Sequence, residues 1–328
     1  MRSDRVQAQL ILSLLGLPGV GPKTARKLLD AGLDANAAED GDLLREAIVA
    51  SGVSGRGLAS LDAASVSASI DATRRVLDRC NDGDIAYLCR GDARLPQAFW
   101  RIDDAPLIMF ARGRWSEGDF DHSAAVIGTR EPTEFGAKTG FRIASRLAEA
   151  GIPVVSGLAI GCDTVAHEGC LSVGGKTAAV MAHGLDTVHP AKNRGLAVRV
   201  VEEGGILLSE YPPGVEARPN RFIERDRLQS AMSRAVVVIE TDIKGGTMHT
   251  VGYAKQQHRL LACVQHPEHL LAEPKTRGNQ ELIRTGQALA LAGSADLQSL
   301  IDKVLGQESA DDAPSSEPIP ENLWGHQG

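Results

Sequence analysis

Glycines, small hydroxyl residues and single cations gather in three short segments, and each segment follows a run of apolar residues. The segments contain Gly128, Thr129 and Arg130; Ser156 and Gly157; and Lys244, Gly245, Gly246 and Thr247. A phosphate group must approach backbone N–H groups closely, which a Cβ would obstruct, and it gains further from a hydroxyl donor and a fixed cation. These residue types therefore predict a site for a chain of phosphates.

The spacing of the glycines does not match two common nucleotide-binding motifs. Gly157 and Gly161 do not form the dinucleotide-binding GxGxxG, and no GxxxxGK[ST] occurs in the chain. The sequence therefore gives no positive support for a bound NAD or a hydrolysed ATP. The alternative that these glycines only turn the chain from strand to helix stays open.

A cluster of arginines supplies the positive charge that a phosphate site needs. The segment from residue 218 to residue 234 holds five arginines and two acids, a local excess of three positive charges where a polyanion could be held. The arginines are Arg218, Arg221, Arg225, Arg227 and Arg234, and the acids are Glu224 and Asp226. A solvated helix face is the plainer interpretation of the same residues.

The formal net charge of −7 hides this local basic character. Five acids and no Lys or Arg follow Lys303, so the rest of the chain carries a charge of only about −2. The five acids are Glu308, Asp311, Asp312, Glu317 and Glu321. Residues 304–328 are also rich in Pro and Ser and have no periodicity, so we expect them to form an acidic, disordered tail.

The elements that must position these segments are those of an α/β protein with a doubly wound sheet. From about residue 84, short apolar runs alternate with helical stretches and glycine turns, as expected for strands covered on both faces. The expected strands are Ala124–Ile127, Pro153–Val155, Thr177–Met181, Ile206–Leu208, Ala235–Ile239 and Leu260–Val264, with flanking strands at Ile85–Leu88 and Leu107–Phe110. Such sheets bind ligands beyond the carboxyl ends of their strands, which is where the glycine-containing segments lie.

Residues 1–80 have the leucine spacing of a small helical domain, and residues 81–303 would form the sheet domain. Gly19 and Gly21 precede Pro22 and Lys23, which predicts a helix-hairpin-helix. In such a hairpin the N–H groups of the second helix, with Lys23 beside them, can take a DNA phosphate as a secondary contact. A helical module for protein contact is an equally good interpretation.

Length and composition exclude several classes of protein. The 328 residues, 43% hydrophobic and 23% charged, are typical of about two globular domains. No apolar run reaches about 18 residues and no signal-peptide pattern opens the chain, so we expect a cytoplasmic protein. The five cysteines form no CxxC pair and no histidine cluster has a recognised ligand spacing, so we expect neither a disulfide framework nor a metal site.

Short motifs follow one another in a definite order between about residues 85 and 290. They include Gly128-Thr129-Arg130, Ser156-Gly157-Leu158-Ala159, Gly161-Cys162-Asp163, Gly184-Leu185-Asp186, Ser209-Glu210-Tyr211-Pro212, Arg225-Asp226-Arg227, Gly245-Gly246-Thr247 and Gly278-Asn279. Each motif is weak alone, but the ordered set resembles the DNA-processing protein A family (DprA, also called Smf) over about three-fifths of the chain. The helical start is similar to that family's N-terminal domain, of the helix-hairpin-helix or SAM-like type.

The resemblance implies an extended Rossmann-like fold with a mostly parallel sheet that binds single-stranded DNA without catalysis. It also implies a homodimer that protects this DNA and helps to load a RecA-type recombinase in transformation or recombination, with no cofactor and no membrane contact. Carried over by position, the DNA-binding residues would be Gly128, Thr129, Arg130, Ser156, Gly157, Lys176, Asn193, Arg225, Arg227, Gly245, Gly246 and Thr247, to which Lys244 adds a mobile charge. Few aromatic residues are present to stack on bases, so binding should tolerate different sequences and weaken with salt.

Several positions depart from the family's pattern. Glu224 and Asp226 place two carboxylates beside the cations, where the family usually has Arg-Asn-Arg preceded by Phe-Pro, and this would weaken phosphate binding. Gly245-Gly246-Thr247 replaces the usual Ser-Gly-Ser turn, and no winged-helix pattern follows Lys303. These differences are compatible with a divergent member that has another ligand.

The competing class is a nucleotide-processing Rossmann enzyme of the lysine-decarboxylase-like phosphoribohydrolase type. Its PGGxGTxxE motif aligns with Gly246-Thr247, but Thr250 stands in place of the catalytic glutamate, which removes the acid or base that hydrolysis requires. Glu210 and Glu240 remain near the same strand ends. A nucleotide sensor without turnover would use the same pocket.

Overall fold

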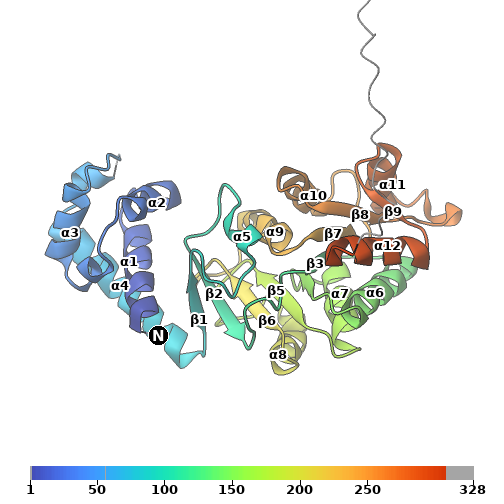
Figure 1. The fold of residues 1–328 in the computed structure, drawn as a ribbon, viewed down its shortest axis with the longest axis horizontal. Coiled ribbons are helices and arrows are strands. Elements are labelled where there is room, and N and C mark those ends of the chain that lie inside the picture. The colour runs from blue at the N-terminus through green and yellow to red at the C-terminus, as the bar shows by residue number, and fades with distance from the viewer. Residues whose placement is uncertain (1, 56, 308–328) are drawn as a thin grey trace, which may run out of the picture.

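The apolar runs form one nine-stranded sheet in the computed structural model, which describes residues 2–55 and 57–307 (Figure 1). The strands are β1 (Ala86–Cys89), β2 (Ile108–Gly113), β3 (Ala124–Ile127), β4 (Val154–Ser156), β5 (Thr177–Met181), β6 (Ile206–Ser209), β7 (Ala235–Val238), β8 (Leu260–Val264) and β9 (Leu289–Leu291). They lie in the order β1-β2-β6-β5-β4-β3-β7-β8-β9. The β1–β2 and β2–β6 pairs are antiparallel and every other pair is parallel, so the prediction of a mostly parallel, doubly wound sheet is confirmed.

Most strands lie where the sequence predicts them. β3, β5 and β8 have the predicted limits, and the other predicted strands are displaced by one to three residues at an end. The sequence does not predict β9, because this strand at the edge of the sheet is three residues long and buries only Leu291. A short apolar run without full burial carries little signal for a strand.

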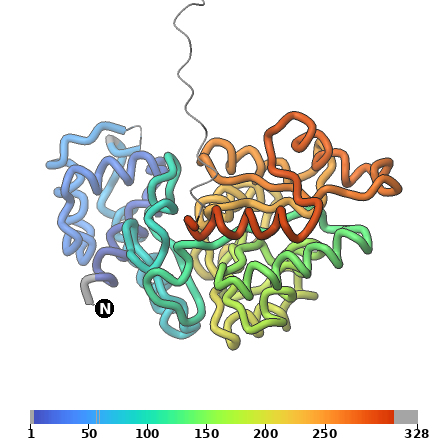
Figure 2. Tube along the Cα trace, turned by 45° about the vertical axis from the view of Figure 1, so that its right-hand side comes forward, coloured from blue at the N-terminus to red at the C-terminus, as the bar shows by residue number. Residues whose placement is uncertain are grey.

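Helices cover both faces of the sheet, and this explains why the strands are apolar throughout. One face packs against α6 (Glu134–Glu149), α7 (Cys162–Leu171), α8 (Arg194–Glu202) and α12 (Ser294–Leu305), and α12 lies beside α6 (Figure 2). The other face packs against α5 (Gln97–Trp100), α9 (Pro219–Met232), α10 (Thr247–Gln256) and α11 (Arg277–Arg284). Ala124 and Ala125 are consecutive residues of β3, yet both are fully buried because each packs into a different layer.

The N-terminal residues form helices, namely α1 (Arg2–Gly16), α2 (Pro22–Asp30), η1 (Ala35–Glu39), α3 (Gly41–Ala50), η2 (Leu58–Ser60) and α4 (Ala63–Asp82). Gly19 has a φ of +74° in the turn between α1 and α2, and Pro22 is the first residue of α2; the assignment of this turn to a helix-hairpin-helix stays a prediction. Gly21 has a φ of −91°, which any residue can adopt, and Lys23 is exposed. Arg26 attaches the domain to the sheet by donating to the Asp103 carbonyl at 3.1 Å.

The division into domains at residues 80 and 303 stays a prediction. α4 continues to Asp82 and α12 continues to Leu305, two residues beyond the expected limits at 80 and 303. Residues 308–328, which we expect to be a disordered tail, lie outside the described residues. Within the described ranges, no helix is both long enough and apolar enough to cross a bilayer.

A buried asparagine joins the carboxyl ends of β7 and β8. Asn279 on α11 has no exposed surface, and its Nδ2 donates to the carbonyls of Val238, Ile239 and Val264 at 3.0 to 3.1 Å. Its Oδ1 accepts from the Thr241 amide at 3.0 Å. One side chain therefore contacts four backbone groups where the two strands end, with its two Nδ2 protons shared among three carbonyls, beside the loops that bind ligands in such folds.

We expect Asn279→Ala to lower the free energy of unfolding by about 3 kcal/mol, because buried carbonyl groups lose their donor and a cavity forms. Urea denaturation followed by circular dichroism measures this change. Asn220→Ala, at an exposed position on α9, is the control and should shift the free energy by less than about 0.5 kcal/mol. Equal losses in the two variants would contradict the role given to the buried amide.

Candidate functional site

The strand order of the sheet reverses between β3 and β7, and a crevice opens at this point. The chain builds β4, β5 and β6 on one side of β3 and later builds β7, β8 and β9 on its other side, so the loops after β3 and β7 diverge. A cavity of 610 Å³ lies between these loops and α9. Open parallel sheets bind ligands at such reversals. Seven of the predicted site residues line the crevice: Gly128, Thr129, Arg130, Arg225, Gly245, Gly246 and Thr247.

The loop after β3 presents a cation on a firmly held backbone. The Thr129 amide donates to the Glu240 carbonyl at 2.8 Å, and a Cβ on Gly128 would lie 2.5 Å from Cys162 Sγ. Arg130 is exposed, and its guanidinium carbon lies 5.5 Å from the centre of the Phe222 ring. Among the described residues no carboxylate pairs with Arg130. Arg130 can therefore receive a phosphate without first losing an ion pair.

The loop between β7 and α10 presents backbone N–H groups to the same crevice. Gly245 donates to the Asp242 carbonyl at 3.0 Å, whereas the amides of Gly246 and Thr247 have no hydrogen-bond partner among the residues that the structure describes. Because α10 begins at Thr247, the positive end of this helix faces the crevice. Lys244 is exposed beside the turn but does not line the crevice.

Arg225 lies beneath the crevice and holds the ends of two strands. Its Nη1 donates to the carbonyl of Gly157 at 3.0 Å and to the carbonyl of Val180, near the carboxyl ends of β4 and β5. Its Nε donates to Asp226 Oδ1 at 3.2 Å, and only 5% of the residue is exposed. The guanidinium is therefore used inside the protein, and Arg225 positions the β4 loop instead of presenting its charge to a ligand.

Three other predicted residues also support the loop after β4. Ser156 is fully buried and its Oγ donates to a backbone carbonyl of β3 at 2.8 Å. The Gly157 amide donates to Asp163 Oδ2 at 3.1 Å, and Asn193 Nδ2 donates to the Leu158 carbonyl at 2.8 Å. The hydrogen-bond donors of these residues are engaged within the fold, so they shape the loop that borders the crevice.

Two predicted cations lie away from the crevice. Arg227 is 8% exposed and points to the other side of α9, where its guanidinium pairs with Glu210 and Asp104, each at 2.8 Å. Lys176 directly precedes β5 and pairs with Asp119 at 2.8 Å. A residue that precedes a parallel strand lies at the amino edge of the sheet, opposite to the crevice. The structure therefore does not bring Arg227 or Lys176 together with Arg130.

Two carboxylates give the crevice a charge that depends on pH. Burial raises the pKa of Asp226 to about 6, although the positive charge of Arg225 acts in the opposite direction. Burial also raises the pKa of Asp163, against the effects of Arg225 and of the amides that donate to this carboxylate. Both groups line the crevice, so it becomes less negative as the pH falls through about 6.

The two glutamates near the strand ends do not line the crevice. Glu240 has no exposed surface and accepts from the amide and hydroxyl of Thr133 at 2.8 and 2.5 Å, and it lies 3.3 Å from His266 Nε2. Burial acts to raise the pKa of Glu240, but the neighbouring His266 and the hydrogen bonds from Thr133 outweigh it and leave the pKa lowered. Glu210 is held by Arg227. These carboxylates therefore anchor neighbouring elements and are not placed as general acids or bases for a ligand in the crevice.

The sequence does not single out several residues that line the crevice. Lys275 comes from η5 (Pro274–Thr276), and its Nζ donates to the Glu131 carbonyl at 2.5 Å, so the lysine bridges to the loop after β3. Phe222 on α9 stacks against Arg130, and His249 lies in the first turn of α10. Ligands of such sheets lie beyond the carboxyl ends of the strands, and η5 follows β8. Applying this rule to the residues after β8 would have added Lys275 to the predicted site.

We expect Arg225→Lys to lower the free energy of unfolding by about 3 kcal/mol, because the shorter lysine does not reach the position of Nη1 and has no Nε–H to donate to Asp226. Thermal and urea denaturation measure the change. Arg218→Lys, at the exposed start of the same helix, is the matched control and should be nearly neutral. An Arg225→Lys protein as stable as the control would show that the guanidinium does not hold the strand ends.

Comparison with known proteins places this architecture in a family. The family model of the DNA recombination-mediator protein A matches residues 86–302. The chain is 34% identical over 218 residues to Protein Smf of Synechocystis sp., covering 65% of this chain and 54% of that protein. It is 37% identical over 186 residues to the putative DNA processing protein DprA of Mycobacterium tuberculosis, covering 56% of this chain and 47% of that protein. The chain thus spans about half the length of these curated relatives.

Solved structures resemble this fold over most of their length. The DNA processing protein A of Streptococcus pneumoniae has a TM-score of 0.65 and 25% identity, and the match covers 84% of this chain and 95% of that one. The protein of the same name from Helicobacter pylori has a TM-score of 0.58 and 27% identity, covering 69% of this chain and 97% of that one, and its structure concerns a single-stranded DNA binding mode. Because the family model matches more than half of the chain, across the whole sheet and its crevice, this chain belongs to the DNA recombination-mediator protein A family.

Proposed function

We propose that this chain binds single-stranded DNA in the crevice between β3 and β7. The observation that carries the proposal is the unpaired Arg130 on the same cavity as the unpaired amides of Gly246 and Thr247. A cation and two N–H groups on a rigid backbone are suited to the phosphates of a polynucleotide. Membership of the family and the DNA binding of the Helicobacter pylori protein support the same assignment.

The phosphates would pass between two cationic borders of the crevice. Arg130 lies on the loop after β3 and Lys275 follows β8, while the start of α10 lies between them. Among the described residues that line the cavity, only Phe222 and His249 carry rings that could stack on a base, and Phe222 already stacks against Arg130. Few base contacts are therefore available, and most of the affinity comes from phosphate contacts that salt weakens.

We further propose that the chain acts without catalysis, in the cytoplasm, as a homodimer that assists a RecA-type recombinase in transformation or recombination. Glu210 pairs with Arg227, and Glu240 accepts a hydrogen bond from Thr133. Neither carboxylate lines the crevice, and this supports a role without catalysis. The description of the family as DNA recombination-mediator proteins supports the proposal that a recombinase is the partner. The exposed residues Gly19, Gly21 and Lys23 of the hairpin remain a proposed secondary DNA contact.

A nucleotide-processing or nucleotide-sensing protein is the second candidate, because 610 Å³ is enough for a mononucleotide. A fluorescence titration with labelled oligodeoxythymidylate, its duplex counterpart and free nucleotides at several salt concentrations separates the two. The proposal is supported if the single strand binds tightly and in a salt-sensitive way while the duplex and the free nucleotides bind weakly. Preferential binding or hydrolysis of a free nucleotide would contradict it.

We expect Arg130→Ala to weaken binding of oligodeoxythymidylate about tenfold, because one charged hydrogen-bond donor to phosphate is lost. The slope of log affinity against log salt should become shallower by about 0.7, one phosphate's share on a single strand. Fluorescence anisotropy at four salt concentrations measures both quantities. Lys176→Ala removes a positive charge at the opposite edge of the sheet and should leave both unchanged. The same change in both variants would overturn the location of the site.

We expect Asp226→Asn to tighten this binding about fivefold at pH 7.5, because the substitution removes a negative charge from the crevice. The difference should vanish at pH 5. The pKa of Asp226 is about 6, so the wild-type carboxyl is ionised at pH 7.5 and largely protonated at pH 5. Glu224→Gln, at an exposed position on the same helix outside the crevice, is the control. Weaker binding by Asp226→Asn at pH 7.5 would show that the carboxylate serves mainly to orient Arg225.

A further inference from the structure

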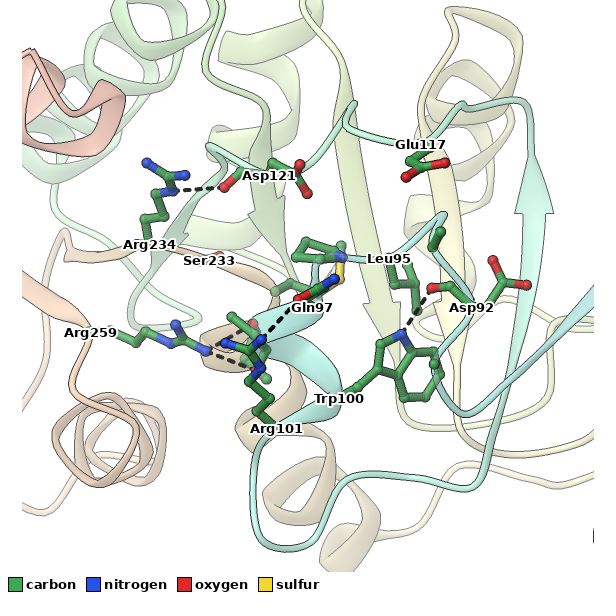
Figure 3. A pocket seen from close by; sticks show the side chains of 16 residues that line it. Asp92, Leu95, Gln97, Trp100, Arg101, Glu117, Asp121, Ser233, Arg234 and Arg259 are labelled. Carbon is green, nitrogen blue, oxygen red and sulfur yellow. Dashed lines mark hydrogen bonds between the residues drawn. The ribbon is translucent and has the colours of Figure 1, made fainter.

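A second cavity lies at the opposite edge of the sheet from the crevice. Its volume is 590 Å³, and it is bordered by the segment between β1 and α5, the end of α9 and residues that precede β3, β7 and β8. Arg101, Arg234 and Arg259 lie on one side of this cavity, and Asp92 and Glu117 lie on the other (Figure 3). The cavity therefore has a basic wall and an acidic wall.

None of the three arginines forms an ion pair within the part of the chain that the structure describes. Arg101 donates to the Gln97 side chain at 2.9 Å, and Arg259 Nη2 donates to the carbonyls of Ala98 and Ala231 at 3.3 and 3.2 Å. Arg259 Nε is buried and has no hydrogen-bond partner in residues 2–55 and 57–307. Burial lowers the pKa of Arg259, and no carboxylate offsets this effect. A partly buried guanidinium without a counterion is unfavourable, so the basic wall is suited to an anion.

The chain leaves the described fold beside this basic wall. Arg234 Nη1 donates to the Val304 carbonyl at 3.1 Å, and His122 Nδ1 lies 3.3 Å from the same oxygen. Val304 belongs to the last turn of α12, and Gln307 is the last residue described. The next residues, 308–321, include five acids and no Lys or Arg. One wall of the cavity and the segment that starts next to it therefore have opposite charges.

We propose that residues 308–321 of this chain bind in the second cavity, with their carboxylates on Arg101, Arg234 and Arg259. Asp311 and Asp312 follow Val304 by seven and eight residues, so an extended chain would place them up to about 25 and 29 Å from that residue. The covalent connection gives the segment a local concentration of the order of millimolar, so weak ion pairs suffice. Asp121 and the acidic wall repel the segment, so its path follows the basic wall.

A nitroxide attached to the segment in the full chain tests this proposal without DNA, so its result is independent of the proposed function. The five native cysteines are buried, and Ser315→Cys therefore provides a single reactive position. Electron paramagnetic resonance should show a slowly moving label that is released by 1 M salt. A second label at Ala93→Cys, on the rim of the cavity, should give a narrow distance distribution in spin-diluted samples.

The arginine variants decide whether the basic wall holds the segment. Arg101→Gln, and Arg101→Gln with Arg259→Gln, should mobilise the Ser315→Cys label and broaden the distances, whereas Arg142→Gln on the exposed surface of α6 should not. Arg101 has only a side-chain partner, so its substitution preserves the fold even if the double variant unfolds. A label that is mobile in the wild-type chain, that stays immobile in the arginine variants, or that pairs only between two copies would overturn the proposal.

Discussion

The position of one buried guanidinium determines the form of the crevice. Near the ends of β4 and β5, backbone carbonyls lie beneath the surface where water cannot serve as a donor. Arg225 donates to the Gly157 and Val180 carbonyls, so both strands can end inside the protein. Residue 157 must be glycine, because a Cβ there would overlap Arg225 Nη1. The carboxylates of Asp163 and Asp226 are the counterions of the buried charge, and their raised pKa values show how much the same burial disfavours them.

The cations available to a ligand consequently lie at the borders of the crevice. Arg130 stacks on Phe222, and Lys275 makes a single bond to a backbone carbonyl, so neither cation has to leave a carboxylate to meet a phosphate. The amides at the start of α10 add donors that cannot move. A site with two cations and a fixed helix end would hold a phosphate chain by charge and shape, which is the reason to expect tolerance of base sequence.

The sequence predicts the backbone of this site better than the directions of its side chains. The segments after β3 and β7 are found because glycines and hydroxyls follow runs that are apolar throughout, and that pattern depends only on local composition. Arg225 and Arg227 occupy the same helix, yet one holds strand ends and the other pairs with Glu210 and Asp104. Which neighbours surround each face of α9 is fixed by tertiary packing, and no local pattern reports it. Lys176 illustrates the same limit, since its place before β5 sets it at the edge of the sheet opposite to the crevice.

α9 lies between the two cavities and borders both. Pro219 at the start of this helix and Gln229 near its end line the crevice, whereas Ala231 and Met232 at its end line the second cavity. Gln229 and Ala231 are two residues apart, a rise of about 3 Å along the helix, which is less than the screening length of about 8 Å at physiological salt. The two cavities are therefore not electrostatically independent. The proposed binding of the acidic segment on the basic wall would make the potential more negative in the part of the crevice that Gln229 lines, and this effect would not require any carboxylate to reach Arg130.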